Sequence, residues 1–236
     1  MVNAKGKMFK DVSATWNPLV GCKHYCVYCW AKEYVEKKLK YKFEKYKQGF
    51  FKPRFIEKEL KKKNFPKAGM VFVVDMGDLF GEWVPKKIIQ KIIDVVEQKQ
   101  ENKFLFLTKN PKRYFKFTFP SNAILGATIE TNDDELYVKH KISRAPLPSE
   151  RIKAMIELDH EHKFVSIEPI LDFKFDEFIE QLVEINPETI YVGYDNYNHK
   201  LPEPPMDKTL RFVKVLREEK GLNVRTKTIR FAWYEE

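Results

Sequence analysis

Cysteine is scarce in this sequence, and the few cysteines lie together. Cys22, Cys26 and Cys29 fall within eight consecutive positions, and the rest of the 236-residue chain contains none. An odd number of cysteines argues against the disulfide framework of a small secreted protein. With no thiol elsewhere, the sequence also excludes a second cysteine-bound cluster and a cysteine that donates hydrogen atoms. Any thiolate chemistry must use this one segment.

Other features are missing as well. No run of about 18 apolar residues is present, so we expect no membrane span. Residues 1–11 lack the apolar stretch of a secretory signal, and we expect a cytoplasmic protein, in which thiols stay reduced. The glycine-rich phosphate loops G-x-x-x-x-G-K-[ST] and G-x-G-x-x-G are also absent. Many Lys and Glu with few Gln are typical of thermophile compositions.

The cysteines that are present have the spacing C-x3-C-x2-C, in the run CKHYCVYC. Three thiolates on one short loop can each bind a different iron of a [4Fe–4S] cube, and the fourth iron is then open to a small molecule. A zinc ion held by three cysteines and His24 is the main alternative. Zinc sites of that kind usually pair cysteines two apart, with the other ligands at a distance. Spacing favours the iron–sulfur cluster and leaves zinc open.

The segment also resembles a known family. C-x3-C-x-aromatic-C is the signature of the radical S-adenosylmethionine (SAM) superfamily, and the aromatic position is Tyr28. The wider stretch TWNPLVGCKHYCVYCWA resembles the phage Gp37/Gp68-like (DUF5131-type) radical SAM family, which is distantly similar to spore photoproduct lyase. Further segments that resemble the family begin at Val71, Phe104, Leu125 and Phe164, so the resemblance covers most of the chain.

This resemblance implies two cofactors and an electron donor. A [4Fe–4S] cluster would be held by Cys22, Cys26 and Cys29, and SAM would be the second cofactor. A reductase, flavodoxin or ferredoxin would supply an electron, and SAM would be cleaved reductively to a 5′-deoxyadenosyl radical that abstracts hydrogen from a substrate. The cofactors would carry this chemistry, and the protein would position them.

Short β-branched or aromatic runs alternate with helical stretches, which predicts an α/β fold with parallel strands and crossover helices. The pattern alone does not separate an open doubly wound sheet from a partial barrel. The resemblance implies a (β/α)6 partial TIM barrel of radical SAM type, as one domain over residues 1–236. The expected strands are 12–16, 70–75, 103–108, 123–130, 163–168 and 189–194, with a short last strand at 223–227. The expected helices begin near Ala31, Pro53, Pro85, Pro111, Ser149, Phe175 and Lys208.

Polar residues follow the expected strands, where ligands bind in parallel α/β folds. Each could also be an ordinary cap or turn residue. The resemblance implies that Tyr28 contacts the adenine of SAM and that Thr128 and Glu130 contact its ribose. Met76-Gly77-Asp78 replaces the usual Gly-Gly-Glu, and there Gly77 with Asp75 or Asp78 would meet the SAM ammonium. The remaining candidates are Arg151, for the SAM carboxylate or a structural salt bridge, and Ser166 and Glu168, for SAM or substrate.

Positive charge is concentrated in one segment. Residues 35–67 carry thirteen Lys or Arg against four Glu, a surplus equal to the net charge of +9 of the whole chain. Aromatic residues are interleaved there, and together with Lys37 to Lys67 they could bind a nucleic acid through phosphate contacts and base stacking. The alternative is a pair of amphipathic helices with aromatics facing the core and lysines facing water.

The sequence thus supports a radical SAM enzyme with one [4Fe–4S] cluster that acts on a nucleic acid or nucleotide-like substrate. One alternative keeps this chemistry but uses a peptide or a small metabolite. Another is a zinc-stabilised nucleic-acid-binding module without catalysis.

Overall fold

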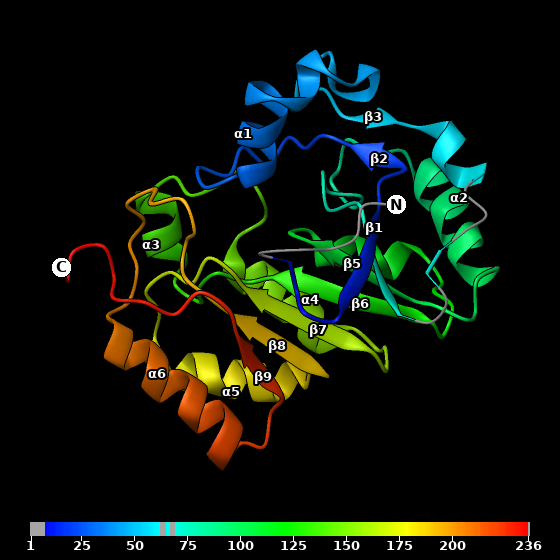
Figure 1. Cartoon of the computed structure of the whole chain (residues 1–236). Coiled ribbons are helices and arrows are strands. Elements are labelled where there is room, and N and C mark those ends of the chain that lie inside the picture. The colour runs from blue at the N-terminus through cyan, green and yellow to red at the C-terminus, as the bar shows by residue number, and fades with distance from the viewer. Residues whose placement is uncertain (1–7, 62–64, 67–68, 236) are drawn as a thin grey trace. The chain divides into compact units, whose positions relative to one another are not determined.

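Seven strands form the main sheet, in the order β1-β4-β5-β6-β7-β8-β9 (Figure 1). The computed structural model describes residues 8–61, 65–66 and 69–235. The pairs β1–β4, β4–β5, β7–β8 and β8–β9 are parallel. Each strand lies beside the strand of this sheet that follows it in the chain, whereas a doubly wound sheet reverses its order at a switch point. The strand order therefore separates two folds that the sequence pattern could not, and it is the order of a barrel-type sheet.

The chain divides into two compact units, which are described separately. The first consists of Met1–Tyr25 and Cys29–Leu125, and the second of Cys26–Tyr28 and Gly126–Glu236. The cysteine loop therefore supplies its middle residues, Cys26 to Tyr28, to the second unit. The expectation of a single domain stays a prediction.

The first unit contains the strands β1 (Val12–Trp16), β4 (Met70–Val73) and β5 (Lys103–Thr108), and the start of β6 (Ala123–Thr128). Its α-helices are α1 (Trp30–Lys37) and α2 (Lys86–Glu97). Apolar residues of α2 recur at helical spacing, and those on one face are buried: Ile89, Ile92, Ile93 and Val96. A small antiparallel pair, β2 (Leu19–Val20) with β3 (Arg54–Phe55), lies outside the main sheet.

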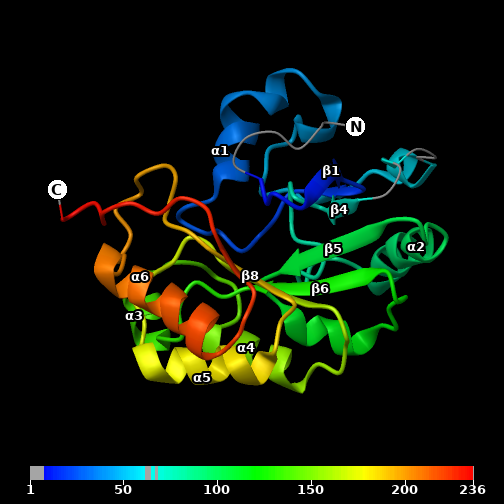
Figure 2. The ribbon, with the colours of Figure 1, turned by 60° about the horizontal axis from the view of Figure 1, so that its bottom comes forward.

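The second unit contains β7 (Lys163–Ile167), β8 (Thr189–Val192) and β9 (Val224–Thr226), which confirms the expected short last strand. Its helices are α3 (Asp134–Lys139), α4 (Pro148–Glu157), α5 (Phe175–Ile185) and α6 (Met206–Lys214), and a π-helical turn, Val215–Glu219, continues α6. Helices α5 and α6 lie side by side (Figures 1 and 2). Phe178 of α5 stacks on Phe212 of α6, with ring centroids 5.4 Å apart.

Part of the basic segment differs from the expectation. The prediction of a second basic helix from about Pro53 is wrong, because Arg54–Phe55 forms strand β3 and Glu57–Lys61 forms a short 3-10 helix. Pairing of β3 with β2 fixes an extended backbone, and Ile56 N donates to Pro18 O (2.7 Å). Two other single turns, Leu39–Tyr41 and Glu44–Tyr46, follow α1. Residues 62–64 and 67–68 of this basic segment lie outside the described residues.

Two further local differences concern helix starts. The expected cap Ser149 lies inside α4, which begins at Pro148, and the Glu150 carboxylate accepts from Leu147 N at 2.8 Å. The helix expected to begin at Pro111 is a 3-10 helix, Pro111–Lys116. Among the described residues, no helix has the length and apolar character needed to cross a membrane.

Candidate cofactor site at the cysteine loop

The cysteine loop begins where Gly21 meets the end of β4. Gly21 N donates to Met76 O (2.8 Å), and Gly21 forms a parallel bridge with Gly77. A Cβ on Gly77 would lie 2.7 Å from Gly21 O, so only glycine fits there. Cys22 N donates to Phe50 O (3.1 Å), which ties the loop to the basic segment. Gly77 therefore allows a close approach of the cysteine-loop backbone, and its predicted contact with SAM stays a prediction.

Each cysteine sulfur has a polar neighbour. Cys22 Sγ accepts from His24 N (3.4 Å), and Cys29 Sγ accepts from Lys32 N (3.4 Å) at the start of α1. Cys26 Sγ lies 3.3 Å from Ser143 Oγ. None of the three cysteines forms a disulfide in the part of the chain that the structure describes. Backbone donors such as those to Cys22 and Cys29 stabilise thiolates, and hydrogen bonds to the sulfurs influence the reduction potential of iron–sulfur clusters.

The three cysteines are the predicted ligands of a cluster, and that assignment stays a prediction. Among the described residues, no three His, Cys, Asp or Glu side chains are grouped so as to hold one metal ion. A cube binds each thiolate on a different iron, so it does not require three ligands on one ion. His24, the proposed zinc ligand, instead places Nε2 2.9 Å from Asp78 Oδ2. The buried Trp83 Nε1 has no hydrogen-bond partner in the part of the chain described, and Trp83 packs against the apolar cluster that contains Cys22.

Asp78 is buried and surrounded by donors from its own unit. Its carboxylate accepts from Thr108 Oγ1 (2.7 Å), Phe80 N (2.9 Å) and Lys109 N (3.0 Å), and it pairs with His24. Burial raises the pKa of Asp78, but hydrogen bonds, chiefly from His24, outweigh burial and lower it below its ordinary value. The carboxylate thus fixes the position of His24 inside the cysteine loop.

Asp75 has a different environment. Its Oδ1 accepts from Asn17 Nδ2 at 2.5 Å, and Asn17 Oδ1 in turn accepts from Met76 N at 3.0 Å. Burial raises the pKa of Asp75 above its ordinary value. Asn17 therefore links the ends of β1 and β4, and the predicted ammonium contacts of Asp75 and Asp78 stay predictions.

In the second unit, four predicted residues are brought together. Arg151 Nη1 lies 2.5 Å from Glu130 Oε2 and 3.0 Å from Thr128 O, and Tyr28 donates from its hydroxyl to Glu130 Oε1. Glu130 and Arg151 are both 0% exposed. Burial, followed by the charge of Glu130, holds the pKa of Tyr28 well above its usual range. Buried charges are stable only when paired in this way.

The other nitrogens of Arg151 are also occupied. Nε donates to Pro146 O (2.7 Å), and Nη2 donates to the hydroxyl of Tyr137 (2.6 Å). Burial disfavours the charged guanidinium, but the charge of Glu130 outweighs burial and raises the pKa of Arg151. Of the two roles the sequence offered for Arg151, these contacts favour the structural salt bridge.

Ser166 and Glu168 lie at the end of β7. Glu168 Oε1 is 3.2 Å from Lys227 Nζ and hydrogen-bonds Ser166, and burial raises the pKa of this carboxyl. A Cβ on Gly193 would lie 3.0 Å from Glu168 Oε1, so Gly193 leaves room for the carboxylate. Lys227 comes from the end of β9 and was not predicted, although it too follows a strand. Tyr137 and Ser143 were missed because no local pattern marks their partners, and His24 was considered only as a zinc ligand.

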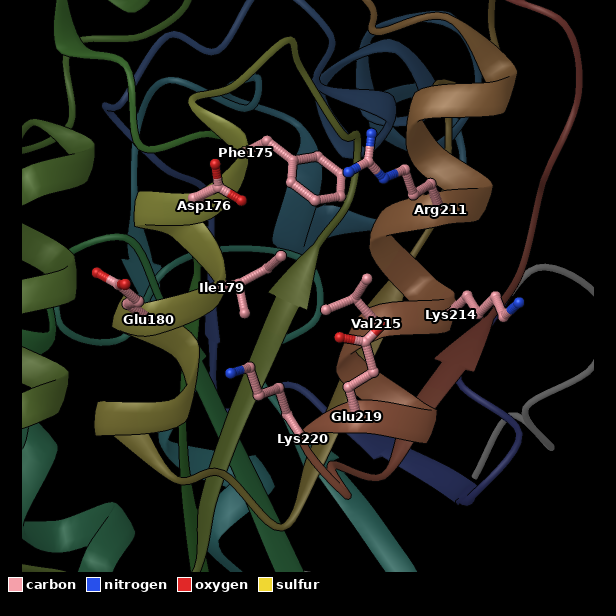
Figure 3. A pocket seen from close by; sticks show the side chains of 9 residues that line it. All are labelled: Phe175, Asp176, Ile179, Glu180, Arg211, Lys214, Val215, Glu219 and Lys220. Atoms are coloured by element: carbon pink, nitrogen blue, oxygen red, sulfur yellow. The ribbon is translucent and has the colours of Figure 1, made fainter.

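A separate pocket of about 390 Å³ lies between α5 and α6 (Figure 3). Helix α5 contributes acidic side chains to it and α6 basic ones. Its lining residues are Phe175, Asp176, Ile179, Glu180, Arg211, Lys214, Val215, Glu219 and Lys220. None of the residues predicted to bind the cluster or SAM lines this pocket, so we do not assign the cofactor site to it.

The sequence matches the model of a family described as "Protein of unknown function (DUF5131)" over residues 9–183. The chain belongs to the DUF5131 family. No protein of curated function matches the DUF5131 chain significantly.

Solved structures similar to the DUF5131 chain include structures from two groups of proteins. A cysteine-to-serine variant of spore photoproduct lyase has a TM-score of 0.60 and 11% identity, over 94% of this chain and 79% of that chain. A variant with bound AdoMet and dinucleoside spore photoproduct has a TM-score of 0.57 and 13% identity, over 80% and 58%. SuiB of Streptococcus suis, bound to precursor peptide SuiA, has a TM-score of 0.54 and 12% identity, over 91% and 48%.

These likenesses confirm the fold expected from the sequence, the (β/α)6 partial TIM barrel of radical SAM type. At such low identity they show the fold alone. The DUF5131 chain also spans less than two thirds of several of these proteins, with 58%, 63% and 58% of three spore photoproduct lyase chains.

Proposed function

We propose that this protein is a radical SAM enzyme of the phage Gp37/Gp68-like group, with a [4Fe–4S] cluster held by Cys22, Cys26 and Cys29. The observation that carries the proposal is the cysteine loop. It follows the first strand of a radical SAM-type fold, its three cysteines are free of disulfides, and each sulfur has a hydrogen-bonding neighbour. A zinc module would need its ligands gathered around one ion. His24, the histidine ligand of that alternative, forms a hydrogen bond with Asp78 instead.

When bound, the cluster and SAM would supply reductive cleavage of SAM by one electron to methionine and a 5′-deoxyadenosyl radical. The chain's own residues hold and orient these groups. Tyr28, beside Cys29, would contact the adenine, and the Glu130–Arg151 pair would fix the position of its hydroxyl. The Thr128 side chain would contact the ribose. Ser166 and Glu168, with Lys227, would contact SAM or the substrate at the strand ends.

The expected surroundings follow from this chemistry. A [4Fe–4S] cluster with an open iron needs a reducing compartment, which agrees with the cytoplasm. There a reductase, flavodoxin or ferredoxin would provide the electron.

The experiment is anaerobic reconstitution with iron and sulfide, followed by SAM and dithionite. We expect a brown protein with four irons per chain that forms 5′-deoxyadenosine. Cys26→Ala should abolish this product, whereas Ser121→Ala, at an exposed position, should not. A colourless protein that binds one zinc per chain would overturn the proposal.

We propose that the substrate is a nucleic acid. Tyr41 is 75% exposed and Phe43 is 52% exposed, among lysines in the basic segment. Amphipathic helices would instead turn these aromatics inward, as Tyr46 and Phe50 do. Lys40 Nζ lies 5.1 Å from the centroid of the Tyr41 ring, so cationic and aromatic groups share one surface. Such a surface suits phosphates and unpaired bases together.

This substrate class can be tested by fluorescence anisotropy with a single-stranded oligonucleotide. Phe43→Ala should weaken binding by about 1–3 kcal/mol, the range measured when one stacked base loses its aromatic partner. Phe231, which is 55% exposed, provides a matched control outside the basic segment, and Phe231→Ala should leave binding unchanged. Equal effects of the two variants, or no binding by the wild type, would favour a peptide or small metabolite as the substrate.

A further inference from the structure

The outer face of α1 carries two large aromatic side chains. Trp30 is 39% exposed and Tyr34 is 45% exposed, whereas Ala31 and Val35 of the same helix are buried. Residues four positions apart lie one above the other on a helix, so the two rings are neighbours on one face. Ala31 and Val35 form the core side of α1, so packing of the helix against its unit does not account for the exposed rings. Adjacent exposed apolar side chains, unlike scattered ones, mark interaction sites.

Exposed rings continue beyond both ends of α1. The first turn after α1 carries the exposed Tyr41. At the other end Cys29 is the N-cap of α1, so the helix starts directly from the cysteine loop. Tyr25 of that loop is exposed, and its ring stacks on the ring of Phe51 with centroids 4.3 Å apart. We call these exposed rings of the first unit the aromatic track: Tyr25, Trp30, Tyr34 and Tyr41.

Positive charge accompanies the aromatic track. Lys38 Nζ lies 5.7 Å from the centroid of the Tyr34 ring, just as Lys40 Nζ lies beside the ring of Tyr41. Both carboxylates of α1 form ion pairs with a lysine four positions further on, so Lys38 is an additional cation on this surface. Rings that can stack on bases, next to cations that can contact phosphates, are typical of surfaces that bind single-stranded nucleic acids. A duplex keeps its bases stacked on one another and offers such a surface only its phosphates.

We propose that a single strand of nucleic acid lies along the aromatic track, with unpaired bases stacked on Trp30 and Tyr34 and the backbone beside Lys38. This inference rests on the proposed function, because it concerns the nucleic-acid substrate. Trp30 and Tyr34 lie outside the basic segment of residues 35–67, so the binding surface is longer than the charge pattern indicates. The track also gives the strand a path from the basic segment to the cysteine loop, where the cofactor site is proposed.

Fluorescence anisotropy with a labelled single-stranded oligonucleotide tests the track. Trp30→Ala and Tyr34→Ala should each weaken binding about 5- to 150-fold, which is the stacking of one base expressed as a ratio of dissociation constants. Trp30→Phe keeps a ring and should retain most of the affinity. Phe115→Ala, which removes an exposed aromatic side chain elsewhere in the same unit, is the matched control and should bind like the wild type.

Two further titrations define the ligand. A duplex of the same sequence should lose no affinity in Trp30→Ala, because its bases do not reach the ring. DNA and RNA strands of the same sequence are compared, and the strand that binds more tightly identifies the kind of nucleic acid.

Tryptophan emission provides a second measurement. A base stacked on an indole ring quenches its fluorescence, and because the chain contains four tryptophans, a variant must assign the signal to Trp30. We expect the emission of the wild type to fall on saturation with the single strand and Trp30→Phe to lose this decrease. Trp233→Phe, in the second unit, should retain it.

The outcomes separate this inference from the proposed function. A wild type that binds no single strand would overturn the nucleic-acid substrate, and the inference with it. A wild type that binds, while Trp30→Ala and Tyr34→Ala bind equally well, would overturn the track and leave the basic segment as the binding surface. An equal loss of affinity in Phe115→Ala would also contradict the track. If the alanine variants do not fold, as judged by circular dichroism, the emission of Trp30→Phe decides, and quenching equal to that of the wild type contradicts the inference.

Discussion

Single residues of the second unit show how a buried charge is accommodated. Arg151 and Glu130 have no contact with water, and each has several hydrogen-bond partners. A buried pair of this kind contributes little beyond what an apolar pair would, but removal of one member leaves a charge without compensation. The same pair fixes Tyr28, so stability and site geometry depend on the same atoms.

Arg151→Met should lower the free energy of unfolding by about 3–5 kcal/mol, because Glu130 is left buried without its cation. Urea denaturation monitored by circular dichroism measures this. Lys153→Met removes an exposed ion pair of the same helix, with Glu157, and should change stability by about 0.5 kcal/mol or less. A cost for Arg151→Met as small as that of Lys153→Met would contradict the buried ion pair.

Asp78 predicts a dependence of stability on pH. The pKa of its carboxyl is lowered in the folded state relative to the ordinary value of 3.8, so its stabilisation is present above that value and is lost as the pH falls through the folded pKa. Asp78→Asn should cost about 1–3 kcal/mol at pH 7, and this difference from wild type should shrink below about pH 4. Urea denaturation at several pH values provides the measurement. Asp94→Asn, on the exposed side of α2, should show no such trend; a constant cost of Asp78→Asn at all pH values would refute the prediction.

At the scale of elements, the cysteine loop is attached to the end of β4 by backbone atoms. The bridge between Gly21 and Gly77 brings the two backbones too close for a side chain at Gly77. Asn17 reinforces this junction through Asp75 and Met76 N. The start of the cysteine loop is therefore fixed by the junction of β1 and β4, before any cofactor binds.

Gly77→Ala tests this junction. The added Cβ would lie 2.7 Å from Gly21 O, a backbone atom that cannot rotate away, and we expect a loss of about 1–3 kcal/mol in the free energy of unfolding. Gly221→Ala is the control, because a Cβ there meets nothing within 4 Å and only the strain of its φ of +68° remains. That strain costs about 1 kcal/mol. The cluster content after reconstitution should also fall in Gly77→Ala alone; equal losses in both variants would argue against the junction.

At the scale of the whole molecule, the charge distribution sets the interaction with polyanions. The surplus of nine positive charges lies within residues 35–67, and the remainder of the chain is balanced. Exposed lysines there include Lys42, Lys47 and Lys52. Neutralisation of phosphates by such groups releases bound counterions, so affinity for a nucleic acid should decrease with salt concentration.

For a single-stranded oligonucleotide, the logarithm of the binding constant should fall linearly with the logarithm of the salt concentration, by about 0.7 per phosphate contact. The triple variant Lys42→Gln, Lys47→Gln, Lys52→Gln should reduce this slope by about 2. Fluorescence anisotropy titrations at salt concentrations from about 50 to about 200 mM measure this slope. Lys214→Gln with Lys220→Gln, in the second unit, is the control and should preserve the slope. An equal decrease in both variants would indicate a nonspecific charge effect.

The predicted fold agrees with the structure wherever the signal is local. The strands at Val12–Trp16 and Lys103–Thr108 and the helix at Phe175–Ile185 have the bounds expected from periodicity. The basic segment after Pro53 misled the prediction, because pairing with β2 decides its conformation and β2 lies more than thirty residues earlier. Periodicity describes one element and its exposed and buried faces, but it carries no information about which distant segment pairs with it.

The sequence by itself determined the cysteine spacing, the alternation of strands and helices, the absence of other thiols and the position of the positive charge, since each is a property of consecutive residues. The tertiary structure decided the order of the strands and the partners of the polar residues. His24 and Asp78 are 54 positions apart, Tyr28 and Glu130 are 102 apart, and Cys26 and Ser143 are 117 apart. A hydrogen bond requires two atoms within about 3 Å, and for residues so distant in the chain only packing of the folded backbone brings this about.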